Sequence, residues 1–233
     1  MMQKKERAAR RTNEQLENDV MSALEALITK RGFMNTSLLS FLKVAGIEAN
    51  VFYRHYGTLD QLYDKFIDQY DFRFYDTQNS DMYKLDNRQF CIKALKKLYV
   101  GLEKNIIMQK ILLWELSNPN PTTCKTAAIR ERMSLDIMRY IGAVFSRASI
   151  DIQPIAALLV AGIYYVILHP RHSGFCTLDF KTDHERKRVF KAIDMLVNLL
   201  FDKLEQEKRY KKMVLRMKKD SISEEKIAYY LGV

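Results

Sequence analysis

Apolar residues recur at intervals of three and four along most of the chain, which is the spacing of one face of an α-helix. Between residues 13 and 30 this stripe comprises Leu16, Val20, Ala23, Leu24, Leu27 and Ile28. Thr12 and Gln15 are spaced as a capping box at its start, and Gly32 follows its end. The pattern therefore predicts a capped first helix that stops at Gly32.

The next segment, residues 36–56, predicts two short helices joined by a tight turn. Thr36 or Ser37 can cap the first helix, whose apolar positions are Leu38, Phe41, Leu42 and Ala45. Gly46 stands at the turn, where a residue without Cβ takes a left-handed backbone conformation at little steric cost. Ile47 is expected to anchor this turn in the core. The spacing is that of a helix-turn-helix, a unit that reads DNA.

The second short helix, about residues 48–56, separates packing positions from outward ones. Val51, Phe52 and Tyr56 are the candidates for packing. The outward positions are Ala49, Asn50, Tyr53, Arg54 and His55. Small, amide, phenolic, guanidinium and imidazole groups together suit a DNA groove. The alternative is a small three-helix core without a DNA partner.

The rest of the chain predicts further helices and few breaks. A fourth helix begins after Thr58, with Gln61 at capping distance, and its apolar side holds Leu62, Tyr63, Phe66, Ile67, Tyr70 and Phe74. After a polar break at 77–81, helices are predicted at 88–103, 106–117, 125–147, 153–168 and 183–207, with a loop at 118–122. Glycine and proline are sparse, at 8 and 4 of 233 residues, which favours an all-α fold.

From about residue 12 to 63 the sequence resembles the amino-terminal domain of the TetR family of ligand-responsive transcriptional regulators. The resemblance rests on RGF at 31–33, AGI at 45–47 and FYRHY at 52–56. It implies a helix-turn-helix DNA-binding domain at residues 1–57 and a helical ligand-binding and dimerisation domain at 58–207, which a basic extension at 208–233 follows. It also implies DNA contacts: Tyr53 and His55 to phosphates, Thr36 and Ser37 bracing the DNA backbone, and Ala49, Asn50 and Arg54 nearest the bases.

Three residues depart from the family pattern. Leu42 replaces a small alanine between the two helices, Glu48 replaces a serine or threonine, and Leu59 replaces a lysine that binds the DNA backbone. The carboxylate of Glu48 suits a helix amino terminus but repels phosphate. These departures keep open an alternative, a TetR-fold interaction or ligand-binding protein with weakened DNA binding.

Charge favours a polyanionic partner, because the chain carries a formal net charge of +10. Part of it lies on an amino-terminal arm that can reach phosphates or a minor groove, through Lys4, Lys5, Arg7, Arg10 and Arg11. Residues 208–219 hold seven basic groups and no acid. This second cluster is either a solvated helix end or a further nucleic-acid contact.

Residues 153–168 are apolar on nearly every side, and such a helix must be covered. Pairing of this helix and the helix at 183–207 with their copies would cover it and form a homodimer. The resemblance implies the same four-helix interface. Two subunits also suit DNA, because paired recognition helices meet half-sites about 34–36 Å apart.

Large apolar side chains of the regulatory helices are candidates for binding a small hydrophobic effector. They are Tyr99, Met108, Trp114, Met138, Tyr140 and Tyr165. Trp114 is favoured because it stands beside Glu115. The alternative for each is ordinary core packing. The functional prediction is a repressor that such an effector releases from operator DNA.

Other functions are not favoured. We find no nucleophile elbow, P-loop, dinucleotide fingerprint or H-E-x-x-H motif, so an enzyme or a cofactor is not predicted. Cys91, Cys124 and Cys176 show no paired spacing, which indicates free thiols. A metal site is weighed against an ordinary loop at His169, His172, Cys176, Asp183 and His184, and Pro170 and Gly174 favour the loop.

The longest apolar run, residues 155–168, is shorter than the roughly 20 residues that cross a bilayer. No apolar run follows the basic amino terminus, so a signal peptide is not predicted. We therefore expect a cytoplasmic protein without a membrane partner. Residues 221–233 predict a short amphipathic helix that docks through Ile227, Tyr230 and Leu231.

Overall fold

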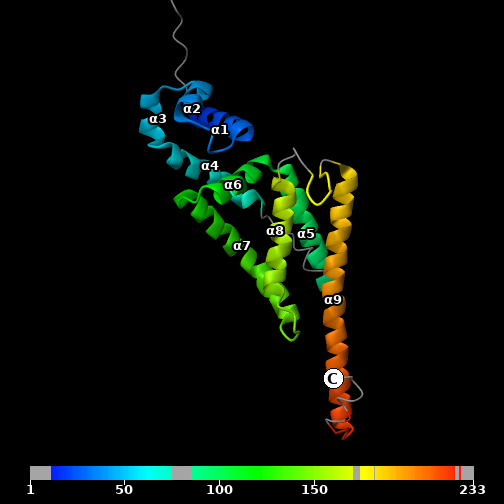
Figure 1. Cartoon of the computed structure of the whole chain (residues 1–233). Helices are drawn as coiled ribbons and strands as arrows, with labels where there is room; N and C mark the ends of the chain where they lie inside the picture. Colours follow the sequence, from blue (N-terminus) through cyan, green and yellow to red (C-terminus); the bar gives the residue numbers. More distant parts are fainter. Residues whose placement is uncertain (1–11, 75–84, 170–173, 181, 224–225, 227–233) are drawn as a thin grey trace, which may run out of the picture. The chain divides into compact units, whose positions relative to one another are not determined.

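The computed structural model describes residues 12–74, 85–169, 174–180, 182–223 and 226 (Figure 1). In these ranges the chain is all-α, as predicted, with one isolated β-bridge between Phe175 and Leu178. The helices are α1 (Asn13–Arg31), α2 (Leu38–Ala45), α3 (Ala49–Tyr56), α4 (Leu59–Phe74), α5 (Asn87–Lys104), α6 (Ile106–Ser117), α7 (Pro121–Phe145), α8 (Ile152–Leu168) and α9 (Asp183–Lys219). The predicted arm at 1–11, the break at 77–81 and most of the tail at 221–233 lie outside the described residues.

The chain packs as two compact units. The amino-terminal unit comprises Met1–Asp76 and Leu102–Met133, and the carboxy-terminal unit comprises Thr77–Gly101 and Ser134–Val233. Packing thus groups α6 and the first half of α7 with α1–α4. The functional division at residues 57 and 207 stays a prediction.

Helix α1 begins and ends as its sequence predicts. Thr12 Oγ1 accepts a hydrogen bond from Gln15 N at 3.2 Å, and Gln15 Oε1 accepts one from Thr12 N at 3.0 Å. This capping box pairs backbone donors that have no partner within the helix. Gly32 closes the other end at φ 77°, and its N–H donates to Ile28 O. Five residues of the predicted stripe are buried, while Leu16 is half-buried.

An aromatic cluster fills the core of the amino-terminal unit. The rings of Phe33 and Trp114 stack with centroids 4.5 Å apart and planes at 9°. Tyr63 meets both rings edge-on, at 5.1 Å from Phe33 and 5.4 Å from Trp114. Phe66 meets Phe33 at 6.5 Å. Helix α6 is therefore part of the core that supports the short helices.

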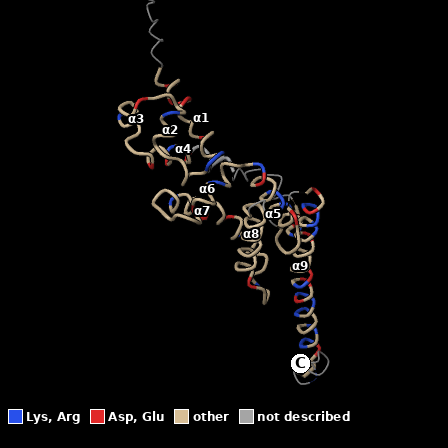
Figure 2. Tube along the Cα trace, turned by 45° about the horizontal axis from the view of Figure 1, so that its top comes forward, with Lys and Arg blue, Asp and Glu red and all other residues tan. Residues whose placement is uncertain are grey.

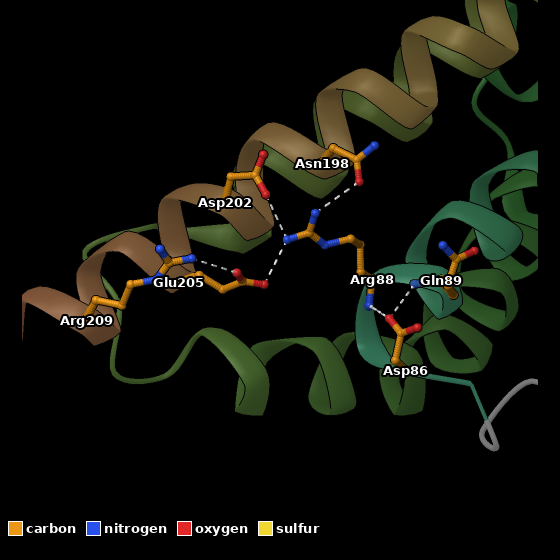
Figure 3. Close-up of polar contacts among 7 residues, drawn as sticks. All are labelled: Asp86, Arg88, Gln89, Asn198, Asp202, Glu205 and Arg209. Carbon is orange, nitrogen blue, oxygen red and sulfur yellow. Dashed lines mark hydrogen bonds and ion pairs between the residues drawn. The ribbon is translucent and has the colours of Figure 1, made fainter. Parts of the chain in front are cut away.

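The core of the carboxy-terminal unit lies between α5, α7, α8 and α9. Its buried residues are Phe90, Ile92, Tyr99, Ile141, Phe145, Ile152, Ile163, Ile193, Val197, Phe201 and Leu204. Beside this core, Arg88 of α5 reaches across to α9 (Figure 3). Its guanidinium lies 2.8 Å from Asp202 Oδ1 and from Glu205 Oε1, and it donates to Asn198 Oδ1 at 3.3 Å. This charged fork fixes α5 against α9.

Both ends of helix α7 differ from the prediction. Helix α7 begins at Pro121, so the predicted loop at 118–122 is shorter, and the helix ends at Phe145 rather than 147. Asn120 explains the early start, because its Oδ1 accepts from Thr123 N at 3.1 Å while its own N donates to Thr123 Oγ1 at 2.9 Å. Proline is also favourable at a first helical position.

Helix α9 runs to Lys219, well past the predicted end at 207. Residues 208–219 are therefore the last turns of this helix. None of the helices among the described residues is both long and apolar enough to cross a membrane.

Candidate nucleic-acid interface

Ser37 caps helix α2. Its Oγ accepts a hydrogen bond from Ser40 N at 3.3 Å, which pairs a backbone donor of the first turn. Thr36, the other candidate, is buried and uses its hydroxyl to donate to Gly32 O at 2.8 Å. Ser37 is exposed and Thr36 is not, so only Ser37 presents its side chain at the start of α2.

Tyr63 of α4 holds the segment that leads into α2. Its hydroxyl donates to Phe33 O at 3.3 Å and to Thr36 O at 3.2 Å. Burial raises the pKa of Tyr63 to about 12, and the charge of Asp60 acts in the same direction. The phenol therefore stays protonated and remains a donor at neutral pH. The apolar stripe of α4 predicted that Tyr63 is buried but gave no sign of this role for its hydroxyl.

The turn between α2 and α3 has the conformation that its glycine predicts. Gly46 adopts φ 60° and ψ 41°, and Ile47 N donates to Leu42 O at 3.3 Å. A β-carbon in this left-handed region crowds the backbone, which is why glycine is preferred there. Ile47 and Leu42 are half-buried. The larger residue at 42 is accommodated at the edge of the helix pair.

Two phenylalanines join the short helices. Phe41 of α2 and Phe52 of α3 are fully buried, and their rings meet at 5.7 Å and 63°. Val51 and Tyr56, also predicted to pack, are half-buried. Burial of Phe52 fixes the rotation of α3 and so determines which residues face outward.

All five residues of α3 that were predicted to face outward are exposed. Ala49, Asn50, Tyr53, Arg54 and His55 are exposed, and Tyr53 is 56% accessible. The positions 49, 50, 53 and 54 lie on one side of a helix, because residues four apart are neighbours there. We call Ala49, Asn50, Tyr53 and Arg54 the recognition surface. His55 is exposed on a different side, in the last turn.

The charge around α3 is mixed. Glu48 is the amino-terminal cap residue of α3, is exposed, and makes no capping hydrogen bond with its side chain. Arg54 and His55 lie in the last turn, and Lys43 is exposed on α2. Leu59, the third departure, is half-buried in the first turn of α4. A carboxylate at the start of α3 thus accompanies basic groups at its end.

The predicted effector residues fall in both units. Met108 and Trp114 are buried in the amino-terminal unit, where Trp114 stacks on Phe33. Tyr99, Met138, Tyr140 and Tyr165 belong to the carboxy-terminal unit. There Tyr99 is buried edge-on to Phe190, and the Tyr140 hydroxyl donates to Asn87 Oδ1 at 2.5 Å. Met138 is half-buried and Tyr165 is exposed. Their role in ligand binding stays a prediction.

The cysteines are free in the structure. Burial raises the pKa of Cys91 to about 11, so this thiol is protonated at neutral pH. Cys124 and Cys176 are exposed. Within the described ranges, no group of three or more histidine, cysteine or acidic side chains could hold a metal ion. His172, one of the residues weighed for a metal, lies outside those ranges.

Comparisons with known proteins find similar solved structures. No family model matches the sequence, and no curated protein matches it. One similar structure is NalD, the secondary repressor of the MexAB-OprM multidrug efflux pump in Pseudomonas aeruginosa. It is 15% identical over 77% of this chain and 97% of that chain, with a TM-score of 0.44. Another is a TetR-family transcriptional regulator from Vibrio parahaemolyticus, 18% identical over 76% of this chain and 95% of that chain, with a TM-score of 0.43. The functional case therefore depends on the geometry of α2 and α3.

Proposed function

We propose that this protein is a TetR-like transcriptional regulator that binds operator DNA through α2 and α3. The observation that carries the proposal is the helix-turn-helix itself. Two eight-residue helices meet at the left-handed Gly46, and burial of Phe52 turns the recognition surface outward. A helix of this size fits the major groove, which presents a distinct pattern of donors and acceptors for each base pair.

The recognition surface has the chemistry for groove contacts. The guanidinium of Arg54 can donate two hydrogen bonds to guanine, and the amide of Asn50 can pair with adenine. The Tyr53 hydroxyl can donate to a phosphate, and the exposed hydroxyl of Ser37 can do the same from the start of α2. Base contacts would come from Asn50 and Arg54, and phosphate contacts would fix the register.

Exposed apolar residues on α8 and α9 support a homodimer. Leu158 is 74% accessible and Met195 is 63% accessible. Large contiguous patches of exposed apolar side chains are unusual on monomeric proteins. We define the dimer face by Leu158 and Tyr165 of α8 and Met195, Leu196 and Leu199 of α9. The spacing places each set on one side of its helix. A second copy that offers the same face would cover both sets in a symmetric contact.

The proposal includes release by a small hydrophobic effector. The regulator would repress until the effector binds among the aromatic and methionine side chains of the regulatory helices. An effector that favours the non-binding state by about 3 kcal/mol changes the population ratio of the two states more than a hundredfold. The proposal assigns no catalytic activity to the chain.

A second candidate function comes from Glu48. Its exposed carboxylate stands at the start of α3 and would repel phosphate. A TetR-fold interaction or ligand-binding protein with weakened DNA binding would tolerate it. Under this alternative, Glu48→Ser raises DNA affinity from a low level.

The test is binding of the full chain to duplex DNA from upstream of its own gene, compared with a scrambled duplex. Arg54→Ala should weaken specific binding by about 1–3 kcal/mol and relax the preference at one base position. Arg132→Ala is the matched control, because Arg132 is also exposed but lies on α7. Equal affinities of wild type and Arg54→Ala for both duplexes would contradict the proposal and favour the alternative.

A further inference from the structure

The last turns of α9 form a basic surface, in which Lys211 donates a hydrogen bond to Arg147 O of the same unit. Residues 208–219 contain seven lysines and arginines and no acid. They follow the last core residue of α9, Leu204, and none of them is buried. Figure 1 shows this part of α9 continuing past the loop between α7 and α8. Figure 2 shows basic residues repeated along it. We call residues 208–219 the basic end.

The acids of α9 lie before the basic end, and most are already engaged. Asp202 and Glu205 hold Arg88, and Glu207 accepts hydrogen bonds from the backbone N and the hydroxyl of Ser149. Glu205 also lies 3.5 Å from Arg209. Among the residues that the structure describes, Lys208, Lys212, Arg216 and Lys219 form no ion pair. These four cations are thus left for a partner outside the unit.

The helical spacing gathers these cations on one broad side. Tyr210, Met213, Val214 and Met217 recur at intervals of three and four and so occupy the opposite side. Val214 and Met217 are half-buried, and the chain turns back at Ile222, whose N donates to Met217 O at 3.0 Å. Twelve helical residues extend about 18 Å, a length over which duplex DNA presents several phosphates.

We propose that the basic end of α9 is a second DNA-binding element, which contacts the phosphates of duplex DNA without reading its sequence. Charge complementarity selects this occupant, because neutralised phosphates release counterions and each contact adds affinity at low salt. A second copy of the basic end is disfavoured, because it would bring like charges together. The exposed apolar residues Tyr210, Met213 and Leu215 make an anionic lipid surface the rival occupant that the experiment tests.

The experiment measures binding of the full chain to a random duplex as a function of salt. The test variant carries Lys208→Gln, Lys212→Gln, Arg216→Gln and Lys219→Gln. The matched control carries Lys93→Gln, Lys187→Gln, Lys191→Gln and Lys203→Gln, which remove the same charge from exposed positions elsewhere. Glutamine is a good helix former, and far-ultraviolet circular dichroism verifies the helix content of both variants.

The test variant should bind the random duplex at least tenfold more weakly at low salt. Its slope of log affinity against log salt should be shallower by up to about 3–4, since each phosphate contact contributes about 0.9. The control variant should keep the slope of the wild type. Equal slopes for the test and control variants would overturn the proposal, because net charge alone would then explain the binding.

Two further measurements separate this element from the helix-turn-helix and from a lipid partner. In an Arg54→Ala background, the four substitutions of the test variant should still weaken binding to the random duplex. The test variant itself should still prefer upstream DNA over a scrambled duplex. Loss of that preference in the test variant would overturn the proposal that the basic end binds DNA separately and without reading its sequence. Tighter binding to phosphatidylglycerol vesicles than to the random duplex, abolished by Met213→Gln, would replace DNA with a membrane surface.

Discussion

Phe33 and Trp114 stack face to face, with ring centroids 4.5 Å apart, although 81 positions separate them in the sequence. Phe33 lies in the segment between α1 and α2, and Trp114 lies on α6. The stack makes α6 part of the core on which the short helices rest. The sole tryptophan of the chain therefore reports on the packing of the amino-terminal unit.

Loss of this ring should destabilise the unit that carries the recognition surface. Trp114→Ala is expected to cost about 3–5 kcal/mol of folding free energy, because it removes a large buried side chain and leaves a cavity. Trp114→Phe keeps a stacking ring and should cost less. Urea denaturation followed by circular dichroism measures both. A cost below 1 kcal/mol for Trp114→Ala would show that the stack does not support the core.

The turn between α2 and α3 should resist a side chain. Gly46→Ala places a β-carbon at φ 60° and is expected to destabilise the protein by about 1 kcal/mol. Gly142 is the matched control, since it lies inside α7 and an added Cβ meets no atom within 4 Å. Gly142→Ala should stabilise by about 0.5–1 kcal/mol. Thermal unfolding distinguishes the two signs, and a stabilising Gly46→Ala would contradict the left-handed turn.

The sequence predicted the amino-terminal helices closely, because their signals are local. The Thr12–Gln15 capping box, Gly32 and Gly46 each act within a few residues, and the structure contains all three. The burial of Phe52 and the exposure of the recognition surface also follow from helical spacing. The choice of Ser37 over Thr36 as the cap, by contrast, could not be predicted. It depends on the carbonyl of Gly32, which accepts from the Thr36 hydroxyl in the folded turn.

Contacts between residues far apart in the chain could not be predicted from the sequence. A stripe of apolar residues shows that Trp114 and Tyr63 face a core, but not which ring or carbonyl each one meets. The predicted start of α7 is too late, because Pro121 is the first helical residue after the Asn120 cap and does not belong to a loop. The predicted end of α9 at 207 is too early, and the structure agrees with the interpretation of residues 208–219 as a solvated helix end.

The dimer face predicts a change of oligomeric state. Leu158→Asp places a carboxylate on α8 and, in a symmetric interface, places it twice. Leu116→Asp on α6 is the control, because Leu116 is 72% accessible and lies outside the dimer face. Sedimentation equilibrium should find Leu158→Asp monomeric and the control dimeric. A monomeric wild type would contradict the proposed pairing.

Glu207 predicts a dependence of stability on pH. The hydroxyl and the backbone N–H of Ser149 lower the pKa of Glu207 from 4.5 because they donate to its carboxylate. The pKa of Glu207 is thus lower in the folded protein than in the unfolded chain. The ionised carboxylate therefore stabilises the fold at pH values above 4.5, and this contribution is lost as the pH falls through the pKa of the folded state.

Glu207→Gln should therefore be less stable than wild type at neutral pH and equally stable in acid. Urea titrations at several pH values measure the difference. Ser149→Ala, which removes the hydroxyl donor, should reduce the effect of the Glu207 substitution, since the two residues interact. A difference that grows as pH falls would contradict the assigned direction.

The central claim is that the recognition surface enters the major groove twice, once from each subunit of a pair. Methylation protection tests it most directly, because dimethyl sulfate modifies guanine N7 on the floor of the major groove. On a bound upstream duplex, the claim predicts two protected patches on one face, with centres about 10–10.5 base pairs or a multiple of this apart. Arg54→Ala should reduce protection within both patches. Binding that leaves guanine N7 unprotected, or a single patch that is insensitive to Arg54→Ala, would contradict the claim.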